Sequence, residues 1–212
     1  MEASQGGGVI VSFDIGIKNL AVAILRTDAS APGSAYIHVW KIISLADKTE
    51  KIPGMNELSE RLFLALDCLV ADLGDDIVID TVLLENQPAR LNGTMKSIQM
   101  IIFSYFQLRK HWEGNVRHVA MVSASNKLQT HTYEPPEPVA KPGKRPMKGY
   151  EKNKWKAIEI AMNYIKDDAV LLTLYNSHKK KDDLADALLQ AISYVRKGGN
   201  AVEKVCGALK TT

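Results

Sequence analysis

The chain has 212 residues, a formal net charge of +3 at pH 7 and 46% hydrophobic residues. This is ordinary for one globular domain with a sizeable core, and the absence of an uncharged apolar run of about 18 residues excludes a membrane-spanning helix. The N-terminal MEASQGGG is not a secretory signal. The two cysteines, Cys68 and Cys206, lack metal-type spacing, so we expect a reducing, intracellular compartment.

The first half of the chain predicts three strands, a helix and a fourth strand. The GIKN segment between the first two strands is short enough for a hairpin turn. The helix has leucines at helical spacing and ends before Gly74, a common stop signal. The fourth strand is β-branched and mostly apolar, as a buried strand would be. The predicted strands cover residues 9–14, 20–26, 36–45 and 77–85, and the helix covers residues 55–73.

The second half predicts a helix, a strand, a loop and two more helices. The first of these helices has an apolar surface wider than one face, so it is either fully buried or packs on both the core and a partner. A basic, proline-rich loop of about residues 124–150 follows the strand, and long loops in compact domains are often functional. The helices cover residues 94–111, 152–165 and 182–196, and the strand covers residues 116–123.

The order of these elements, β-β-β-α-β-α-β-α-α, predicts an α/β domain. A mixed sheet with helices packed on it fits this order better than a strictly alternating doubly wound fold. The domain is expected to span residues 9–197, with a flexible tail at residues 1–8 and a C-terminal tail at residues 198–212.

Several acidic residues occupy positions where a carboxylate is unusual or suggests a site. Asp14 lies in the apolar first strand, where an unpaired charge is costly, although an aspartate that caps the following turn would also explain it. Glu85 ends the fourth strand, where sites gather in parallel sheets, although strands often end in polar residues. Asp183 and Asp186 share a helical face. Asp182 is an alternative partner of Asp186, and a helix N-terminus itself favours carboxylates.

Together these carboxylates predict a site for hard cations. Acidic ligands without His or Cys favour Mg²⁺ or Mn²⁺, and several converging carboxylates can hold two metals about 3.5–4 Å apart, which activate a water and stabilise the leaving oxygen in phosphodiester cleavage. Residues 141–156 carry seven Lys or Arg residues and one acidic residue. This stretch fits a polyanion such as DNA, but a solvated charged surface would look the same.

The segments FDIGIKNLA, LLENQP and KKDDLADAL resemble the motifs of RuvC-type Holliday junction resolvases, in particular the branch of poxviruses, other large DNA viruses and fungal mitochondria. The resemblance runs over residues 9–195. It implies an RNase H-like fold, with a mixed central sheet whose first three strands are antiparallel and with helices on both faces. It also implies that Asp14, Glu85, Asp183 and Asp186 are the catalytic residues and bind two Mg²⁺ ions per active site, for which Mn²⁺ may substitute.

The same resemblance implies a homodimer that makes paired symmetric nicks in four-way DNA junctions and leaves 5′-phosphate and 3′-hydroxyl ends. Such an enzyme would act in DNA recombination and repair or in the resolution of replicated viral genomes, in a viral compartment of the cytoplasm or in a mitochondrion. The predicted dimer contacts are Met95, Ile98, Ile102 and Tyr105. The predicted DNA contacts are Lys18, Asn19, Asn86, Gln87, Lys144, Arg145, Lys148, Lys180 and Lys181.

Three other functions remain open on the sequence alone. An RNase H-like nuclease for RNA–DNA hybrids or flaps would carry similar acids, and a monomeric state would favour it. An actin-like or sugar-kinase-like ATPase also has an Asp-x-Gly motif near an N-terminal hairpin, but this chain is short for that fold, and nucleotide binding would be its mark. A non-catalytic DNA-binding module is harder to reconcile with clustered acids, because carboxylates repel phosphates unless a metal intervenes.

Overall fold

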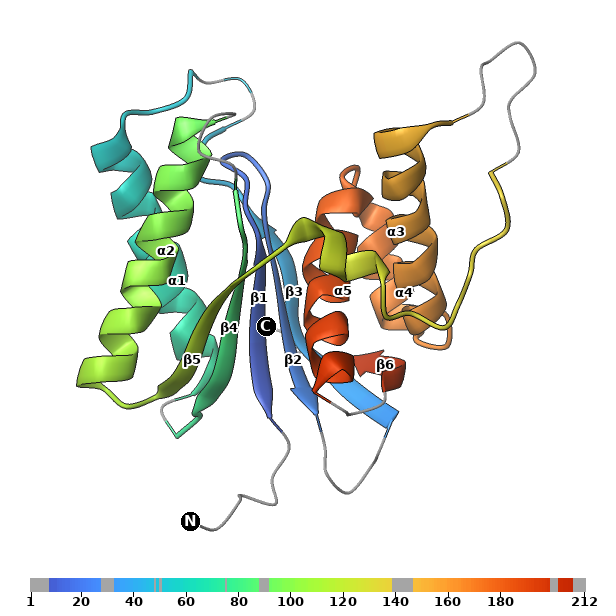
Figure 1. Ribbon diagram of the computed structural model, residues 1–212. Coiled ribbons are helices and arrows are strands. Elements are labelled where there is room, and N and C mark those ends of the chain that lie inside the picture. The colour runs from blue at the N-terminus through green and yellow to red at the C-terminus, as the bar shows by residue number, and fades with distance from the viewer. Residues whose placement is uncertain are drawn as a thin grey trace.

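The structure is a computed structural model, and it describes residues 8–27, 33–47, 49, 51–74, 76–87, 92–138, 147–198 and 202–207. Its strands are β1 (Val9–Asp14), β2 (Leu20–Thr27), β3 (Gly33–Ile43), β4 (Ile79–Glu85), β5 (Val116–Val122) and β6 (Val202–Gly207). They form a single six-stranded sheet in the order β5-β4-β1-β2-β3-β6 (Figure 1).

The sheet is mixed. β1 pairs with β2 and β2 with β3 in antiparallel fashion, whereas β1 with β4, β4 with β5, and β3 with β6 are parallel pairs. The predicted mixed sheet with three antiparallel first strands is therefore confirmed. Because β1, β4 and β5 run in the same direction, their C-terminal ends reach the same edge of the sheet.

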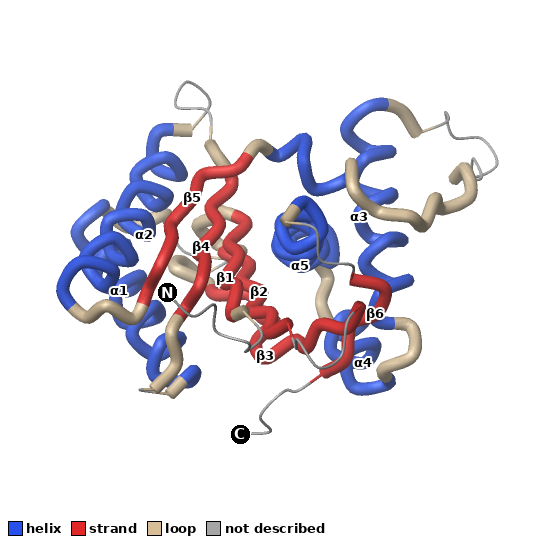
Figure 2. Tube along the Cα trace, turned by 60° about the horizontal axis from the view of Figure 1, so that its bottom comes forward, coloured by secondary structure: helices blue, strands red, loops and turns tan. Residues whose placement is uncertain are grey.

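Helices cover both faces of the sheet, as predicted (Figure 2). One face carries α1 (Met55–Leu73) and α2 (Gly93–Trp112). The other carries α3 (Gly149–Ile165), α4 (Ala169–Ser177) and α5 (Lys181–Lys197), and the 3₁₀-helix η1 (Ala124–Leu128) joins β5 to this side. None of the described helices has both the length and the apolarity that a membrane span requires.

The two faces of the sheet have separate hydrophobic cores, and β1 contributes to both. Val11 and Phe13 pack with the leucines of α1 and with α2, whereas Ile10 packs with α5 on the opposite face. Side chains alternate along a strand, so Ser12 and Asp14 share the α5 face with Ile10. Asp14 therefore stands on the face that α5 covers.

Three features differ from the prediction. α4 was not predicted, because its nine residues are too few to show a clear helical period. Asp168 caps this helix by accepting from the backbone N–H groups of Val170 and Leu171, at 3.0 and 2.9 Å. The predicted irregular loop begins with η1. The predicted C-terminal tail contains β6, which adds a strand to the sheet and buries Val202 and Val205.

Candidate active site

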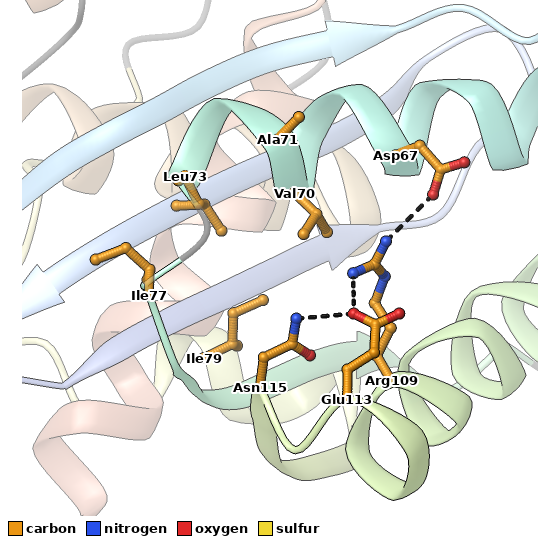
Figure 3. A pocket seen from close by; sticks show the side chains of 10 residues that line it. Asp67, Val70, Ala71, Leu73, Ile77, Ile79, Arg109, Glu113 and Asn115 are labelled. Carbon is orange, nitrogen blue, oxygen red and sulfur yellow. Dashed lines mark hydrogen bonds and ion pairs between the residues drawn. The ribbon is translucent and has the colours of Figure 1, made fainter.

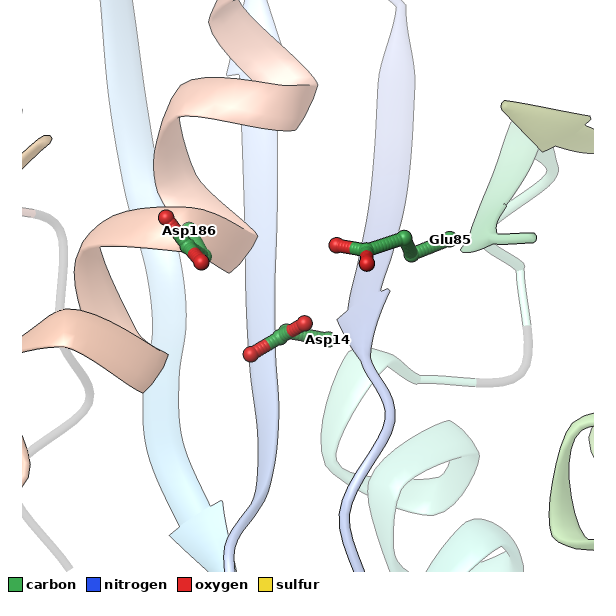
Figure 4. Close-up of side chains that lie close together, drawn as sticks. All are labelled: Asp14, Glu85 and Asp186. Atoms are coloured by element: carbon green, nitrogen blue, oxygen red, sulfur yellow. The ribbon is translucent and has the colours of Figure 1, made fainter. Parts of the chain in front are cut away.

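The carboxylates of Asp14, Glu85 and Asp186 converge at one edge of the sheet (Figure 4). Phe13 of β1 lies opposite Leu84 of β4, so the next residue of each strand, Asp14 and Glu85, leaves the sheet at the same level. Asp186 comes from α5, which packs on the face of the sheet that carries Asp14. One carboxylate oxygen of each residue lies within 4.8 Å of those of the other two. The convergence that the sequence predicted for these three acids is thus present in the structure.

Hydrogen bonds from α5 to the sheet fix the position of Asp186. Gln190, one helical turn after Asp186, donates from Nε2 to Ser12 Oγ at 3.0 Å and to the Phe13 carbonyl at 3.3 Å. On β3, Trp40 donates from Nε1 to the Leu184 carbonyl at 3.0 Å. All of these side chains are buried except for the half-buried Asp186, and buried hydrogen bonds of this kind are costly to break. The helix therefore holds Asp186 over Asp14.

Lys127 provides a positive charge within this cluster. It lies in η1, and its Nζ donates to Glu85 Oε2 at 2.8 Å and to Asp186 Oδ2 at 2.6 Å. Burial lowers the pKa of Lys127, but the attraction of Asp186, Asp14 and Glu85 outweighs burial and raises the pKa above its ordinary value. The ammonium group therefore stays charged and takes the place that a cation would occupy between the carboxylates.

Lys127 was not among the predicted site residues, although the chain carries a signal for it. β5 is the parallel neighbour of β4, with Val122 opposite Glu85, so residues that follow β5 reach the same edge as Glu85. Applying the strand-end rule to β5 as well as to β4 would have singled out residues 124–128. That rule gives the location, but it does not identify Lys127 among them.

The chemistry of the cluster fits a hard divalent cation. Burial raises the pKa of Asp14 well above its ordinary value, although the positive charge of Lys127 acts to lower it. Burial likewise raises the pKa of Asp186. Packed carboxyl groups of this kind repel one another when ionised. Oxygen-only ligands suit Mg²⁺ or Mn²⁺, and the ammonium of Lys127 already stands in for part of the charge of such an ion.

Asp183 and Asp182 have different electrostatic environments, and neither belongs to the group of three converging carboxylates. Asp182 is ion-paired with Lys154 of α3, and this bond outweighs burial and lowers the pKa of Asp182. Asp182 and Asp183 both line the pocket of the three clustered carboxylates. Asp183 has no such ion pair among the contacts of the described residues, and burial, with repulsion from Asp182, raises the pKa of Asp183 to about 6. Asp183 is thus the better candidate for a fourth ligand, and Asp182 serves as the anchor of Lys154.

We expect Asp183→Asn and Asp182→Asn to change the metal-free stability in opposite ways. Asp183 binds its proton more tightly in the folded chain, so its contribution to stability is complete below pH 3.8 and is lost as the pH rises through about 6. Asp182 contributes above its unfolded pKa and loses this contribution on acidification. Urea denaturation in EDTA between pH 4 and 7 measures this through the free energy of unfolding. In Asp183→Asn the free energy of unfolding should fall less between pH 4 and pH 7 than in wild type. In Asp182→Asn it should be lower than in wild type at pH 7. An unchanged pH profile for Asp183→Asn would contradict this assignment.

The acidic cluster opens into a pocket of about 620 Å³. Gln87, one of the predicted DNA contacts, lines it together with Tyr150 and Lys154, while Asn86 accepts a hydrogen bond from Lys96 Nζ at 3.2 Å. The remaining described candidates stand outside the lining of this pocket: Lys18, Asn19, Lys148, Lys180 and Lys181. Lys144 and Arg145 lie outside the described residues.

A second pocket, of about 380 Å³, lies at the opposite end of β4 and β5 (Figure 3). Arg109 of α2 bridges Asp67 of α1 and Glu113, and Asn115 donates to Glu113 at 3.0 Å. The arrangement ties α1 to the C-terminal end of α2, and its two carboxylates share the Arg109 guanidinium.

The chain has the RNase H-like fold of RuvC-type Holliday junction resolvases, with an acidic cluster at the edge of its sheet. The yeast mitochondrial Holliday junction resolvase Ydc2 matches it with a TM-score of 0.59 and 18% identity, over 92% of this chain and 82% of that one. RuvC of Thermus thermophilus, in complex with a Holliday junction substrate, matches with a TM-score of 0.54 and 12% identity, over 91% of this chain and 98% of that one. At these identities the likeness concerns the fold.

Similarity in sequence extends to one large-virus protein. An uncharacterized protein of Acanthamoeba polyphaga mimivirus is 33% identical over 121 residues, which is 55% of this chain and 29% of that protein. The match thus spans less than a third of the length of that relative. No family model matches the sequence.

Proposed function

We propose that the protein is a Mg²⁺-dependent, structure-selective DNA endonuclease that resolves four-way junctions by paired symmetric nicks. The observation that carries the proposal is the convergence of Asp14, Glu85 and Asp186 at the C-terminal ends of two parallel strands in a RuvC-type fold. Both Ydc2 and RuvC are Holliday junction resolvases, and one of the RuvC structures holds its junction substrate. Similarity to a giant-virus protein is compatible with a role in viral DNA recombination or genome resolution.

The side chains of the cluster have distinct roles in this proposal. Asp14, Glu85 and Asp186, with Asp183 as the fourth carboxylate, would hold two Mg²⁺ ions, and such ions supply an activated water and charge neutralisation at the leaving oxygen, giving 5′-phosphate and 3′-hydroxyl ends. Lys127 would give up its position between Glu85 and Asp186 when divalent cations bind there, because like charges repel. Its ammonium would then be available to a phosphate oxygen of the DNA.

The pocket and the neighbouring parts of the chain supply groups that suit a DNA strand. Tyr150 is exposed at the start of α3, and the Lys154 ammonium lies 4.9 Å from its ring centroid. Lys148 is exposed just before this helix, and Lys180 precedes α5 beside Asp182 and Asp183. Lysines bind phosphates without regard to base sequence, so they would give salt-dependent affinity for the junction arms.

The dimer that we propose requires a surface different from the one predicted by the sequence. Ile98 and Ile102 are fully buried in the core of their own chain, so assigning them to a dimer interface was wrong. Tyr105 is half-buried and donates from its hydroxyl to Asp67 Oδ1 at 2.6 Å, and Met95 lines the acidic pocket. The large apolar side chains that α1 and α2 leave exposed are Met55, Phe63, Leu64, Met100, Leu108 and Trp112. We place the contact with a second copy on this outer face.

We expect Leu108→Glu to weaken the dimer without unfolding the chain. The Leu108 side chain is 58% exposed in the single chain, so a charge there remains hydrated in the monomer but must lose its water in an apolar interface. Sedimentation velocity should show dimers of wild type and monomers of Leu108→Glu at the same concentration. Val170→Glu is the matched control, because Val170 is 62% exposed on α4, on the other face of the sheet. A stable Leu108→Glu dimer would move the interface elsewhere.

The test of the proposed function uses a labelled synthetic four-way junction. Wild type should place symmetric nicks in two opposite strands with Mg²⁺ or Mn²⁺ and none in EDTA. The products should be ligatable, as expected for 5′-phosphate and 3′-hydroxyl ends. A duplex, a flap and an RNA–DNA hybrid of the same sequence serve as competing substrates. Preferred cleavage of the hybrid or flap would support the alternative RNase H-like nuclease, and nucleotide hydrolysis without DNA cleavage would overturn the proposal.

A further inference from the structure

The backbone of Lys127 is held by a partly buried hydrogen-bond network around His131. The Lys127 carbonyl oxygen lies 2.6 Å from His131 Nε2 and accepts a second hydrogen bond from Ser193 Oγ at 3.3 Å. His131 Nδ1 lies 3.0 Å from the Tyr164 hydroxyl, and Thr130 donates to Ser193 Oγ at 3.0 Å. The segment after η1 is thereby tied to both α3 and α5.

The chemistry of these groups fixes the direction of each hydrogen bond. A carbonyl oxygen only accepts, so Nε2 of His131 carries the proton, and Nδ1 then accepts from the Tyr164 hydroxyl. Burial lowers the pKa of His131 and, with Arg196 and Lys156, outweighs the hydrogen bond to the Lys127 carbonyl, which acts in the opposite direction. Burial raises the pKa of Tyr164. A neutral imidazole and a neutral phenol follow. The Tyr164 ring also packs edge-on against the His131 ring, at 5.5 Å between centroids.

The network connects Lys127 to the same helix that carries its acidic partner. Ser193 lies two helical turns after Asp186, on the same face of α5. The helix therefore fixes the Lys127 backbone through Ser193 and binds its ammonium through Asp186, at 2.6 Å. A lysine side chain loses considerable rotamer freedom when its end is held. A fixed backbone reduces the range of positions that the ammonium can sample.

We propose that His131 is a positioning residue: its hydrogen bond to the Lys127 carbonyl, supported by Tyr164, places the Lys127 ammonium between Glu85 and Asp186. His131 itself contacts none of the clustered carboxylates in the hydrogen bonds of the described residues. Its influence on the site therefore passes through Lys127. The inference rests on the proposed function only for its catalytic consequence, since the placement of the ammonium also governs cation binding without DNA.

A double-mutant cycle between His131 and Lys127 tests the inference by Mn²⁺ binding in the absence of DNA. Lys127→Met removes the charge that competes with the ion, and we expect it to tighten Mn²⁺ binding about tenfold. His131→Phe keeps an aromatic ring but removes the hydrogen bonds to Lys127, Tyr164 and Ser193, and should tighten binding about threefold in the wild-type background. In the Lys127→Met background His131→Phe should change the affinity by less than about 1.5-fold, because residues that act through one another are not additive.

The conservative variant His131→Gln separates the hydrogen bond from packing. Its amide can donate to the Lys127 carbonyl in place of Nε2, so its Mn²⁺ affinity should stay within about twofold of wild type. For junction cleavage, His131→Phe should lower kcat about tenfold with unchanged junction affinity in Ca²⁺, and His131→Gln should restore most of kcat. Equal effects of His131→Phe in both Lys127 backgrounds, or a Gln variant that behaves like Phe, would overturn the inference.

The role of His131 can still be decided if wild type does not cleave DNA or if His131→Phe does not fold. If wild type cleaves no branched DNA, the proposed function fails, whereas the Mn²⁺ cycle still decides the role of His131. If His131→Phe does not fold, Tyr164→Phe removes only the hydroxyl that donates to Nδ1. That variant should tighten Mn²⁺ binding about twofold in the wild-type background and leave Lys127→Met unaffected. Unchanged Mn²⁺ affinity in Tyr164→Phe would then overturn the inference.

Discussion

Asp14→Asn is expected to lower junction cleavage about a thousandfold or more, because an amide replaces one of the three carboxylates whose oxygens lie within 4.8 Å of one another. Mn²⁺ binding should weaken in parallel. The chain itself should remain folded, because burial raises the pKa of Asp14, which means that the folded state favours the uncharged form that Asn imitates. The thermal midpoint in EDTA at pH 7 should therefore equal or exceed that of wild type, while single-turnover cleavage is lost.

Asp72→Asn is the matched control for this variant. Asp72 lies on α1, its side chain is 51% exposed, and its ion pair with Lys41 is on the surface. Exposed pairs of this kind contribute about 0–1 kcal/mol, so both cleavage and metal binding should match wild type. Substantial cleavage by Asp14→Asn, with the control intact, would remove Asp14 from the proposed site.

Gly16→Ala is the second change for which a large effect is expected. A Cβ at position 16 would lie 2.4 Å from the Asn19 carbonyl oxygen and 3.0 Å from its carbon. Both atoms are backbone and cannot move aside without opening the turn between β1 and β2. Overpacking of this kind costs about 1–3 kcal/mol. The free energy of unfolding in urea should fall by about that amount, and cleavage should fall as well, because the turn begins directly after Asp14.

Gly93→Ala distinguishes this clash from a general effect of added bulk. Gly93 opens α2, and a Cβ there would meet nothing within 4 Å. Alanine is favoured over glycine in helices by about 1 kcal/mol, so this variant should be as stable as wild type or more so. Equal stability of Gly16→Ala and Gly93→Ala would show that the turn can open at little cost.

The sequence predicted the central elements well because their patterns are long and regular. The leucines of α1 repeat at helical spacing through Leu58, Leu62 and Leu66, and the predicted and observed helices have the same bounds. The mixed sheet, confirmed here, follows from a hairpin and a buried β4. In contrast, α4 is only nine residues long, too short to show a clear helical period, and β6 becomes a strand by pairing with β3. Such contacts between distant segments cannot be read from a local pattern.

The candidate site was predictable to the extent that its residues stand out locally. Asp14 is conspicuous as a charge in an apolar strand, and Asp186 lies too far inside α5 to serve its N-terminus. Lys127 has no comparable mark, because a lysine in a loop is usual; only the register of β5 with β4 brings it to Glu85. Ile98 and Ile102 were assigned to a partner because an apolar stripe does not show which of its sides faces the core.

Two pairs of residues connect α5 with β1: Gln190 is hydrogen-bonded to Ser12, and the carboxylate of Asp186 lies close to that of Asp14. Four residues of helix advance about 6.0 Å, and two residues of strand advance about 6.6 Å. The two distances nearly match, so both pairs of residues can meet without bending the helix or the strand. One residue inserted between Asp186 and Gln190 would turn Asp186 by about 100° around the helix axis. The separation of Asp186 and Gln190 along the chain is therefore as strict a requirement for the cluster as the identity of its carboxylates.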